Sequence, residues 1–202
     1  IMPIGLISDV HGNLPALTAV LADMPPVDAV VCAGDVVGYN PWPAECVDRV
    51  RDVCDTVVQG NHDRTVENPH RYRGNRMAEA GLELAKAELT AEQREWLADL
   101  PRTATLAGEF LLVHDHPEHR DKYVHPDEFP TLRRYLDDHA GVVIGHTHVQ
   151  HEATVDDRLI VNPGSVGQPR DGVAGAAYAV LHPEDRSVDL HRTGYDVDGV
   201  VS

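Results

Sequence analysis

Short apolar runs alternate with helix-patterned segments in the first part of the chain, and this alternation constrains the fold more than any other feature. The runs IGLISD, AVVCAGD and TVVQGN cover residues 4–9, 29–35 and 56–61. Between them, residues 14–24 and 43–53 carry apolar side chains at helical spacing. A βαβαβ order of this kind predicts parallel strands joined by crossover helices.

The second part of the chain carries different signals. Residues 75–100 are helix-patterned, and TAEQ at Thr90–Gln93 has the spacing of a capping box. TATLA and FLLVH, residues 103–107 and 110–114, flank a Gly-Glu pair and predict a hairpin. The remaining predicted elements are a loop at 114–130, a short helix at 131–139, a strand at 142–146, and antiparallel pairs at 151–162 and 176–193. We therefore expect a mixed α/β (α+β) fold of two packed β-sheets flanked by helices, in a single domain over residues 1–202.

The charge balance of the chain is strongly acidic. There are 33 Asp and Glu against 17 Lys and Arg, a formal net charge of −16, and the lysines are Lys86 and Lys122 alone. This balance argues against broad binding of a nucleic-acid backbone and against attraction to anionic membranes. It is typical of proteins from salt-loving cells, where salt screens the self-repulsion, and we predict a halophilic protein.

Cysteine usage and the absence of long apolar stretches bear on the compartment. Cys32, Cys46 and Cys54 form no CxxC pair, so we expect reduced, mostly buried thiols of a cytoplasmic protein. No apolar stretch has transmembrane length, and no basic leader precedes an apolar run and a cleavage site. We therefore expect neither a membrane span nor a signal peptide.

Predicted strands repeatedly end in residue types that bind metal ions. The carboxyl ends of strands in an α/β sheet form the ligand crevice, so these residues are expected to meet there. Each motif alone, such as a D-x-H after a strand, is better explained as a turn or a cap than as a ligand. Five such motifs in one chain favour a shared metal site instead. The candidate ligands are Asp9, His11, Asp35, Asn61, His114, His146 and His148.

The chemistry of these donors narrows the type of metal site. Imidazole, carboxylate and amide groups suit borderline first-row ions such as Mn²⁺, Fe²⁺ or Zn²⁺. No thiolate is among them, which argues against a structural zinc site. Seven ligands divide naturally over two ions bridged by a carboxylate. Two-metal sites with ions about 3.5–4 Å apart serve in-line displacement at phosphorus. On an ideal strand, however, His146 and His148 would point the same way and could chelate one ion.

The ordered set D-x-H, G-D, G-N-H, H and G-H-x-H resembles that of the calcineurin-like metallophosphoesterases. The phrases VVCAGDVVGYNPWPAECV and VNPGSVGQPRDG are similar to the small prokaryotic phosphodiesterase branch of that superfamily. The resemblance covers residues 4–181. It implies a four-layer αββα sandwich. It also implies a phosphate-ester substrate and a cofactor of two divalent metal ions, Mn²⁺ foremost, with Fe, Zn, Ni or Co as other ions.

The resemblance further implies a role for each residue. One ion would be held by Asp9, His11 and His148, the other by Asn61, His114 and His146, with Asp35 bridging the two. A water bridging the ions would be the nucleophile. His62 would protonate the leaving oxygen as general acid, its ring oriented by Asp63, Asp9 or a backbone carbonyl. Gly145 would let the backbone approach the site, and the turn at residues 162–165 would lie beside it.

Some polar residues outside this set are candidates for binding substrate. Arg64 and Arg170 suit a phosphate, because arginine binds phosphate bidentately; a surface ion pair is the alternative for each. Tyr39 and Asn40 follow the Asp35 motif and are expected to line the cleft. Asp115 stands where many relatives have glycine, and it would narrow the mouth, add negative charge or offer a further ligand.

These expectations favour a phosphodiesterase, because an alkoxide leaving group gains from the proton donor His62. A phosphomonoesterase, a protein phosphatase or a nucleotide-polyphosphate hydrolase would use the same ligands and is the alternative within the enzyme class. A non-catalytic scaffold, like a retromer subunit that resembles this family, is disfavoured because all seven ligands are present. We expect a homodimer, as for other small relatives.

Overall fold

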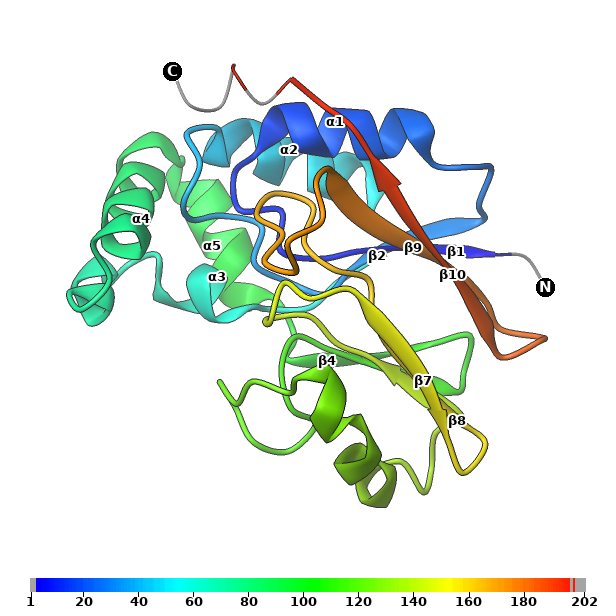
Figure 1. The fold of residues 1–202 in the computed structure, drawn as a ribbon. Helices are drawn as coiled ribbons and strands as arrows, with labels where there is room; N and C mark the ends of the chain where they lie inside the picture. Colours follow the sequence, from blue (N-terminus) through cyan, green and yellow to red (C-terminus); the bar gives the residue numbers. More distant parts are fainter. Residues whose placement is uncertain (1–2, 197, 199–202) are drawn as a thin grey trace.

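The structure is a computed structural model that describes residues 3–196 and 198. Two five-stranded sheets form its centre, in the orders β10-β9-β1-β2-β3 and β4-β5-β6-β8-β7 (Figure 1). The strands are β1 (Ile4–Ile7), β2 (Ala29–Cys32), β3 (Thr56–Val57), β4 (Thr103–Leu106), β5 (Phe110–Val113), β6 (Gly141–Val143), β7 (His151–Val155), β8 (Arg158–Asn162), β9 (Ala176–His182) and β10 (Ser187–Thr193).

Some of the helices begin at side-chain caps that their sequences favour. Asn13 caps the first helix by accepting from the Ala16 amide. Thr90 and Gln93 form the predicted capping box, each side chain accepting from the other residue's backbone N–H. The helices are α1 (Leu14–Asp23), α2 (Pro43–Val53), α3 (Asn61–Thr65), α4 (Arg76–Glu88) and α5 (Ala91–Asp99), with 3₁₀ helices η1 (Pro69–Tyr72) and η2 (Pro126–Tyr135).

The first sheet confirms the predicted parallel βαβαβ unit. β1 pairs with β2, and β2 with β3, in parallel. The predicted antiparallel pair β9–β10 joins this sheet, because β9 lies antiparallel to β1 with Gly5 opposite Val180. The end of the chain thus flanks its beginning. The strands are shorter than predicted, ending at Ile7, Cys32 and Val57, so the polar motifs lie in the turns beyond them.

The second sheet is mixed, because it contains parallel pairs that were not predicted beside the predicted antiparallel ones. The β4–β5 hairpin and the β7–β8 pair are antiparallel as predicted. However, β5, β6 and β8 run parallel to one another. The long connection through η2 returns the chain to the starting end of β5, which is what a parallel neighbour requires.

The helical segment before β6 also differs from the prediction at residues 131–139. It is the 3₁₀ helix Pro126–Tyr135, which begins earlier and contains Pro130. A proline inside a helix lacks the N–H for an i to i−4 bond, so the segment does not wind as a regular α-helix.

Three apolar clusters separate four layers. The first lies between the helices and the first sheet and includes Leu17, Val47 and Leu82. The second lies between the two sheets, and the third lies under η2 on the outer face of the second sheet. Figure 1 shows the layers in this order, from α1 and α2 through both sheets to the short helical segment. The expected αββα sandwich is confirmed, with a 3₁₀ helix as its outer layer. None of the helices in the described part of the chain is long and apolar enough to cross a lipid bilayer.

Candidate metal centre

The turns after the strands bring the predicted ligands together in a buried cluster. Seven candidate ligands have between 0 and 7 % of their surface exposed. Several of them have a left-handed backbone, which non-glycine residues adopt at a cost and which concentrates at functional sites. These are Asp9 (φ 53°), His11 (48°), Asp35 (57°), His146 (74°) and His148 (61°).

Every histidine of the predicted ligand set donates one ring N–H to a backbone carbonyl. A carbonyl oxygen can only accept, so the bonded nitrogen carries a proton and the other nitrogen is the one that can offer a lone pair to a metal ion. The bonds are His11 Nδ1 to Val37 O (2.9 Å), His114 Nδ1 to Ala33 O (2.7 Å), His148 Nδ1 to Gln168 O (2.7 Å) and His146 Nε2 to Asp121 O (3.2 Å). Four imidazoles are thereby fixed in the tautomer that a metal ligand needs.

Asp9, His11 and His148 form the first group of donors. The Nε2 atoms of the two histidines lie 3.0 Å apart, so they can approach this closely only with a proton or a cation between or beside them. Asp9 Oδ2 accepts from the Ser8 hydroxyl and the His146 amide, whereas its Oδ1 is buried and has no hydrogen-bond partner among the described residues. That Oδ1 lies 3.2 Å from His148 Nε2 and 3.6 Å from His11 Nε2. Converging buried acceptors are unfavourable unless a cation lies among them, so these three side chains fit a metal ion.

Asn61, His114 and His146 form the second group. The Asn61 amide nitrogen donates to the Tyr72 hydroxyl, which turns Oδ1 toward His114 Nε2 at 3.1 Å. The His114 and His146 rings lie with centroids 5.0 Å apart. Amide oxygen and imidazole nitrogen again face each other as acceptors, and this group too fits a metal ion.

Asp35 lies between the two groups. Its Oδ1 accepts from the His62 amide, while its Oδ2 lies 3.5 Å from His11 Nε2 and 3.3 Å from His114 Nε2. Ligand atoms of Asp9, His11 and His148 lie within 4.8 Å of one another, as do those of Asp35, His114 and His146. One carboxylate is therefore within reach of both groups.

The electrostatics of the cluster favour bound positive charge. Burial opposes ionisation of Asp9, but the His148 and His114 imidazoles hold its pKa well below its usual range. Burial likewise opposes ionisation of Asp35, and His114 and His62 hold its pKa low. Against the effect of burial, the Asp35 and Asp9 carboxylates raise the pKa of His114 to about 10. Both carboxylates are ionised at neutral pH, as metal ligands must be.

His62 lies beside the cluster between two aromatic rings. Its centroid is 5.0 Å from that of Tyr39 and 4.8 Å from that of Tyr72, and its Nδ1 is buried without a hydrogen-bond partner. Burial lowers the pKa of His62 to about 3 even though Asp35 opposes the shift. Proton donation by this ring therefore requires an anionic group beside it that stabilises the imidazolium.

Asp63 does not orient His62, in contrast to the first of the expected arrangements. Its carboxylate accepts from the backbone N–H groups of Gly60, Asp35 and Val36, at 2.8 to 3.0 Å. Within residues 3–196, no hydrogen bond joins the Asp63 carboxylate to the His62 ring. Asp63 is the N3 residue of the short helix α3, and its carboxylate accepts from the N–H of the N-cap residue Gly60. It also accepts from the N–H groups of Asp35 and Val36 and so holds the Asp35 turn in place.

The predicted close approach at Gly145 is observed. A Cβ at this position would lie 2.1 Å from Ser8 Oγ and 2.7 Å from Asp9 Oδ2. The turn at residues 162–165 lies beside the site as expected, because Ser165 Oγ donates to the Asp9 carbonyl at 2.7 Å. His146 and His148 both lie beyond the end of β6, and each lies within 4.8 Å of a different set of donors.

Two residues expected to bind substrate have other partners. Arg64 forms a bidentate ion pair with Asp121 at 2.7 Å, which is the alternative that the sequence left open. The Asn40 side chain donates to the His11 carbonyl at 3.0 Å and so supports a ligand turn. Asp115 is paired with Arg102 at 3.3 Å and accepts from the Asp121 amide, so it braces the loop after β5.

Tyr39 and Arg170, both candidates for binding substrate, lie together beside the cluster. The Tyr39 ring is 4.9 Å from that of His11, and the Arg170 guanidinium donates to the Tyr39 hydroxyl at 3.2 Å. Sequence reasoning missed Tyr72, which holds Asn61, and Tyr123, which stacks on His146 with centroids 3.8 Å apart. No motif marks either tyrosine; only the folded chain brings them to the ligands.

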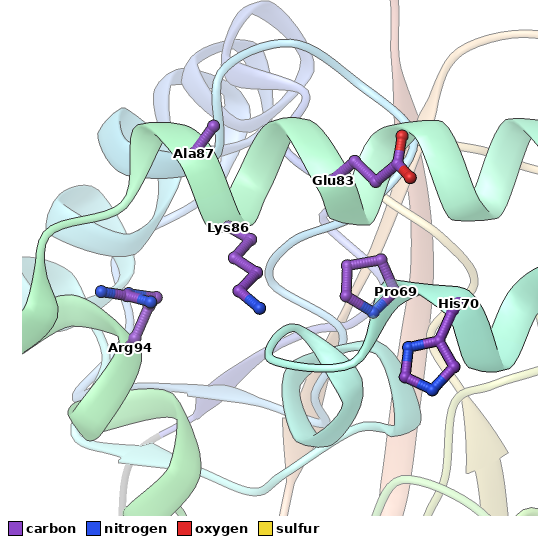
Figure 2. Close-up of a pocket in the computed structure, with 6 residues that line it drawn as sticks. All are labelled: Pro69, His70, Glu83, Lys86, Ala87 and Arg94. Atoms are coloured by element: carbon purple, nitrogen blue, oxygen red, sulfur yellow. The ribbon is translucent and has the colours of Figure 1, made fainter.

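A cavity of about 420 Å³ lies elsewhere, beside η1 and α4 (Figure 2). It is lined by Pro69, His70, Glu83, Lys86, Ala87 and Arg94, none of which belongs to the ligand cluster. Its two cations are already bound, since Lys86 donates to the Glu67 carbonyl and Arg94 to the Glu67 carboxylate. Neither cation of this cavity is therefore free to bind a ligand.

The two-sheet sandwich and its strand-end cluster of buried imidazole, carboxylate and amide donors define a metal-dependent hydrolase. Residues 2–186 match the family model of the calcineurin-like phosphoesterase superfamily domain. The chain belongs to this superfamily and is accordingly a hydrolase acting on phosphoric esters.

Individual relatives agree with this assignment. The chain is 34 % identical to a metallophosphoesterase from Sphaerobacter thermophilus of known crystal structure, with a TM-score of 0.84 over 98 % of this chain and 91 % of that one. It is 32 % identical to an uncharacterized protein of Methanocaldococcus jannaschii, covering 96 % of this chain and 88 % of that one. It is 27 % identical to phosphodiesterase YfcE of Escherichia coli, covering 90 % and 88 %.

Proposed function

We propose that this protein is a phosphodiesterase that works through two divalent metal ions. One ion is assigned to Asp9, His11 and His148, the other to Asn61, His114 and His146, with Asp35 shared. The observation that carries the proposal is that each group presents converging buried acceptors whose tautomers or amide orientation are already fixed. The likeness to a relative named phosphodiesterase supports the reaction class.

Bound ions would polarise the phosphoryl oxygens and supply, at neutral pH, a water of lowered pKa as nucleophile. The chain's own contribution is to hold the donors rigidly and to exclude bulk water, since every ligand side chain is buried. His62 is assigned as the general acid, because its ring lies next to the Asn61 ligand and near Asp35. The anionic phosphate is the partner that would favour its protonated form.

Arg170 is assigned to the substrate phosphate. Its guanidinium lies over Tyr39, 5.8 Å from the ring centroid, and its backbone N–H donates to the His148 carbonyl. Within residues 3–196 and 198 no carboxylate forms an ion pair with it, in contrast to Arg64 and Arg102. An arginine without an acidic partner beside a metal cluster is available to an anionic substrate.

Other parts of the proposal extend beyond the reaction class. We assign Mn²⁺ as the ion, because the mixed N/O donor sets suit a borderline metal. A cytoplasmic location, a homodimer and adaptation to high salt remain predictions, the last resting on the net charge of −16. Metal analysis of protein purified without added metal, light scattering and salt titration test the ion, the dimer and the salt requirement.

The reaction is tested with the full chain loaded with Mn²⁺, against bis(4-nitrophenyl) phosphate, diphenyl phosphate and 4-nitrophenyl phosphate. We expect turnover of the diesters in excess of the monoester, and loss of activity with a chelator. Preference for the monoester would favour the phosphomonoesterase alternative. No turnover of any of the three with any first-row ion would contradict the enzyme assignment itself.

The role of His62 is tested with His62→Gln on the two diesters. Phenoxide is a poorer leaving group than 4-nitrophenoxide and depends more on a proton donor. Loss of the donor should therefore slow hydrolysis of diphenyl phosphate by about 10²- to 10⁴-fold, and hydrolysis of bis(4-nitrophenyl) phosphate by less. Metal content should stay at the wild-type level. His139→Gln is the matched control, because that histidine lies outside the cluster. An equal loss on both diesters would remove His62 from the role of general acid.

A further inference from the structure

The loop between β5 and η2 lies over the second group of donors and carries a tyrosine that the proposed mechanism does not use. Tyr123 belongs to the loop between β5 and η2, and it is 46 % exposed although its ring is large and aromatic. It stacks face to face on the His146 ring, with centroids 3.8 Å apart and an interplanar angle of 12°. A solvent-accessible aromatic ring therefore lies in direct contact with the imidazole of a candidate ligand.

The Tyr123 loop is built into place rather than loosely attached. Asp115 accepts from the Asp121 amide at 2.6 Å, and Asp121 in turn binds Arg64 through both carboxylate oxygens. The Asp121 carbonyl accepts from His146 Nε2. Tyr123, two residues further along the chain, stacks on the same imidazole. The loop therefore contacts His146 both through the Asp121 carbonyl and through the Tyr123 ring.

Arg170 links this loop to the opposite side of the cluster. Its guanidinium donates to the Tyr39 hydroxyl at 3.2 Å. Its positive charge also opposes the effect of burial, which raises the pKa of Tyr123, so Arg170 acts on both rings. Tyr39 contacts His11 of the first group, whereas Tyr123 contacts His146 of the second. A cation and two tyrosine rings thus span both metal positions. This combination matches a molecule that joins an anionic phosphate to a planar aromatic group.

We infer that Tyr123 and Arg170 determine specificity for phosphodiesters that carry an aromatic group on the ester arm that is retained. This inference rests on the proposed phosphodiesterase function and names the substrate class of the same site. Arg170 binds the phosphate, and Tyr123 stacks on the planar arm. Stacking of aromatic rings corresponds to about 3- to 10-fold in binding, so the preference should be of that size.

The test uses two diesters with the same leaving group, phenyl 4-nitrophenyl phosphate and ethyl 4-nitrophenyl phosphate. The full Mn²⁺-loaded chain is assayed for release of 4-nitrophenolate, and the ratio of kcat/KM for phenyl over ethyl is compared between variants. Comparing ratios removes the different intrinsic reactivities of the two esters. We expect Tyr123→Leu to lower the ratio about 3- to 10-fold and Tyr123→Phe to retain it.

Controls separate specificity from damage to the fold. Tyr195→Leu removes a tyrosine that packs against the helix side of the first sheet, and it should keep the wild-type ratio. Arg170→Met should raise KM for both diesters by about tenfold, and Arg170→Lys should recover part of that loss. A Tyr123→Leu ratio equal to that of wild type would overturn the inference while the phosphodiesterase assignment stands. Absence of turnover in the wild-type chain would instead overturn the proposed function and this inference with it.

Discussion

The Nε2 atoms of His11 and His148 face each other across 3.0 Å, and each ring already donates its Nδ1 proton to a backbone carbonyl. Two lone pairs at this distance repel unless a positive charge lies between or beside them. Asp9 Oδ1, buried and without a partner, completes the group. The protein has built this arrangement at the cost of left-handed backbone at all three residues, about 1–3 kcal/mol each.

The first prediction concerns metal removal. Binding of ions to the native cluster should stabilise the fold, by about 2.7 kcal/mol at a hundredfold excess over Kd for one site. Chelation should lower the Tm, and Mn²⁺ should restore it. His148→Ala should lose the ion assigned to Asp9 and His11 and show a smaller recovery, whereas His182→Ala, in an exposed pair with Asp189, should behave as wild type. Unchanged metal content in His148→Ala would contradict the ligand assignment.

The second prediction separates two roles for Asp63. Its carboxylate accepts hydrogen bonds from four backbone N–H groups, so Asp63→Asn would place a side-chain N–H against one or more of these donors. We expect a loss of about 2–4 kcal/mol in the free energy of unfolding by urea. Asp189→Asn, at an exposed position, is the control and should change little. If Asp63→Asn instead kept wild-type stability and, like His62→Gln, lost more activity on diphenyl phosphate than on bis(4-nitrophenyl) phosphate, Asp63 would be restored as the partner of His62.

The third prediction concerns the close approach of two backbone segments. Gly145→Ala places a methyl group 2.1 Å from Ser8 Oγ, so the turn that carries His146 must move away from Asp9. We expect a cost of about 1–3 kcal/mol and a lower metal content, measured by urea unfolding and by metal analysis. At Gly74, a Cβ meets nothing within 4 Å and should be tolerated. Equal behaviour of the two alanine variants would show that the approach is not required.

The fourth prediction follows from the net charge of −16. Raising NaCl from 0.1 M to 1 M shortens the screening length from about 10 Å to about 3 Å, which weakens repulsion among the surface carboxylates. The Tm should therefore rise with salt. NaCl is preferred to sulfate salts, because sulfate strengthens apolar burial in any protein. A Tm that does not respond to NaCl would argue against adaptation to high salt.

The fifth prediction concerns thiol reactivity and its pH dependence. Burial and the neighbouring Asp55 raise the pKa of Cys54 to about 12. The thiolate is the reactive form of cysteine, and at pH 8 only about one Cys54 side chain in ten thousand is a thiolate. The rate of labelling of Cys54 should therefore rise about tenfold per pH unit up to the pKa. Ellman's reagent should label native Cys54 slowly at pH 8 and label all three cysteines rapidly in denaturant. Rapid native labelling would contradict this burial.

Much of the fold could be predicted because its signals are local. The periodicity of residues 4–61, the capping box at Thr90 and the hairpin after Leu106 depend on neighbours in sequence, and all were confirmed. The parallel pairing of β5, β6 and β8 could not be predicted, because it depends on where a long connection returns. The 3₁₀ helix was misplaced because the prolines up to Pro130 indicated a loop, whereas the folded chain winds through Pro126 and Pro130 as a 3₁₀ helix.

The sequence by itself determined the donor types and their order along the chain. It also placed the Asp, Asn and His residues after strands, and the carboxyl ends of parallel strands lie at the same edge of a sheet. It also determined the acidic surface. Only the tertiary structure decided which donors share a group, because that depends on left-handed turns and carbonyl partners from distant segments such as Gln168. The same long-range packing led the Asp63 carboxylate to bind backbone N–H groups instead of the His62 ring, and it placed Tyr72 and Tyr123 at the site. Such contacts arise between residues far apart in the chain, where no local pattern records them.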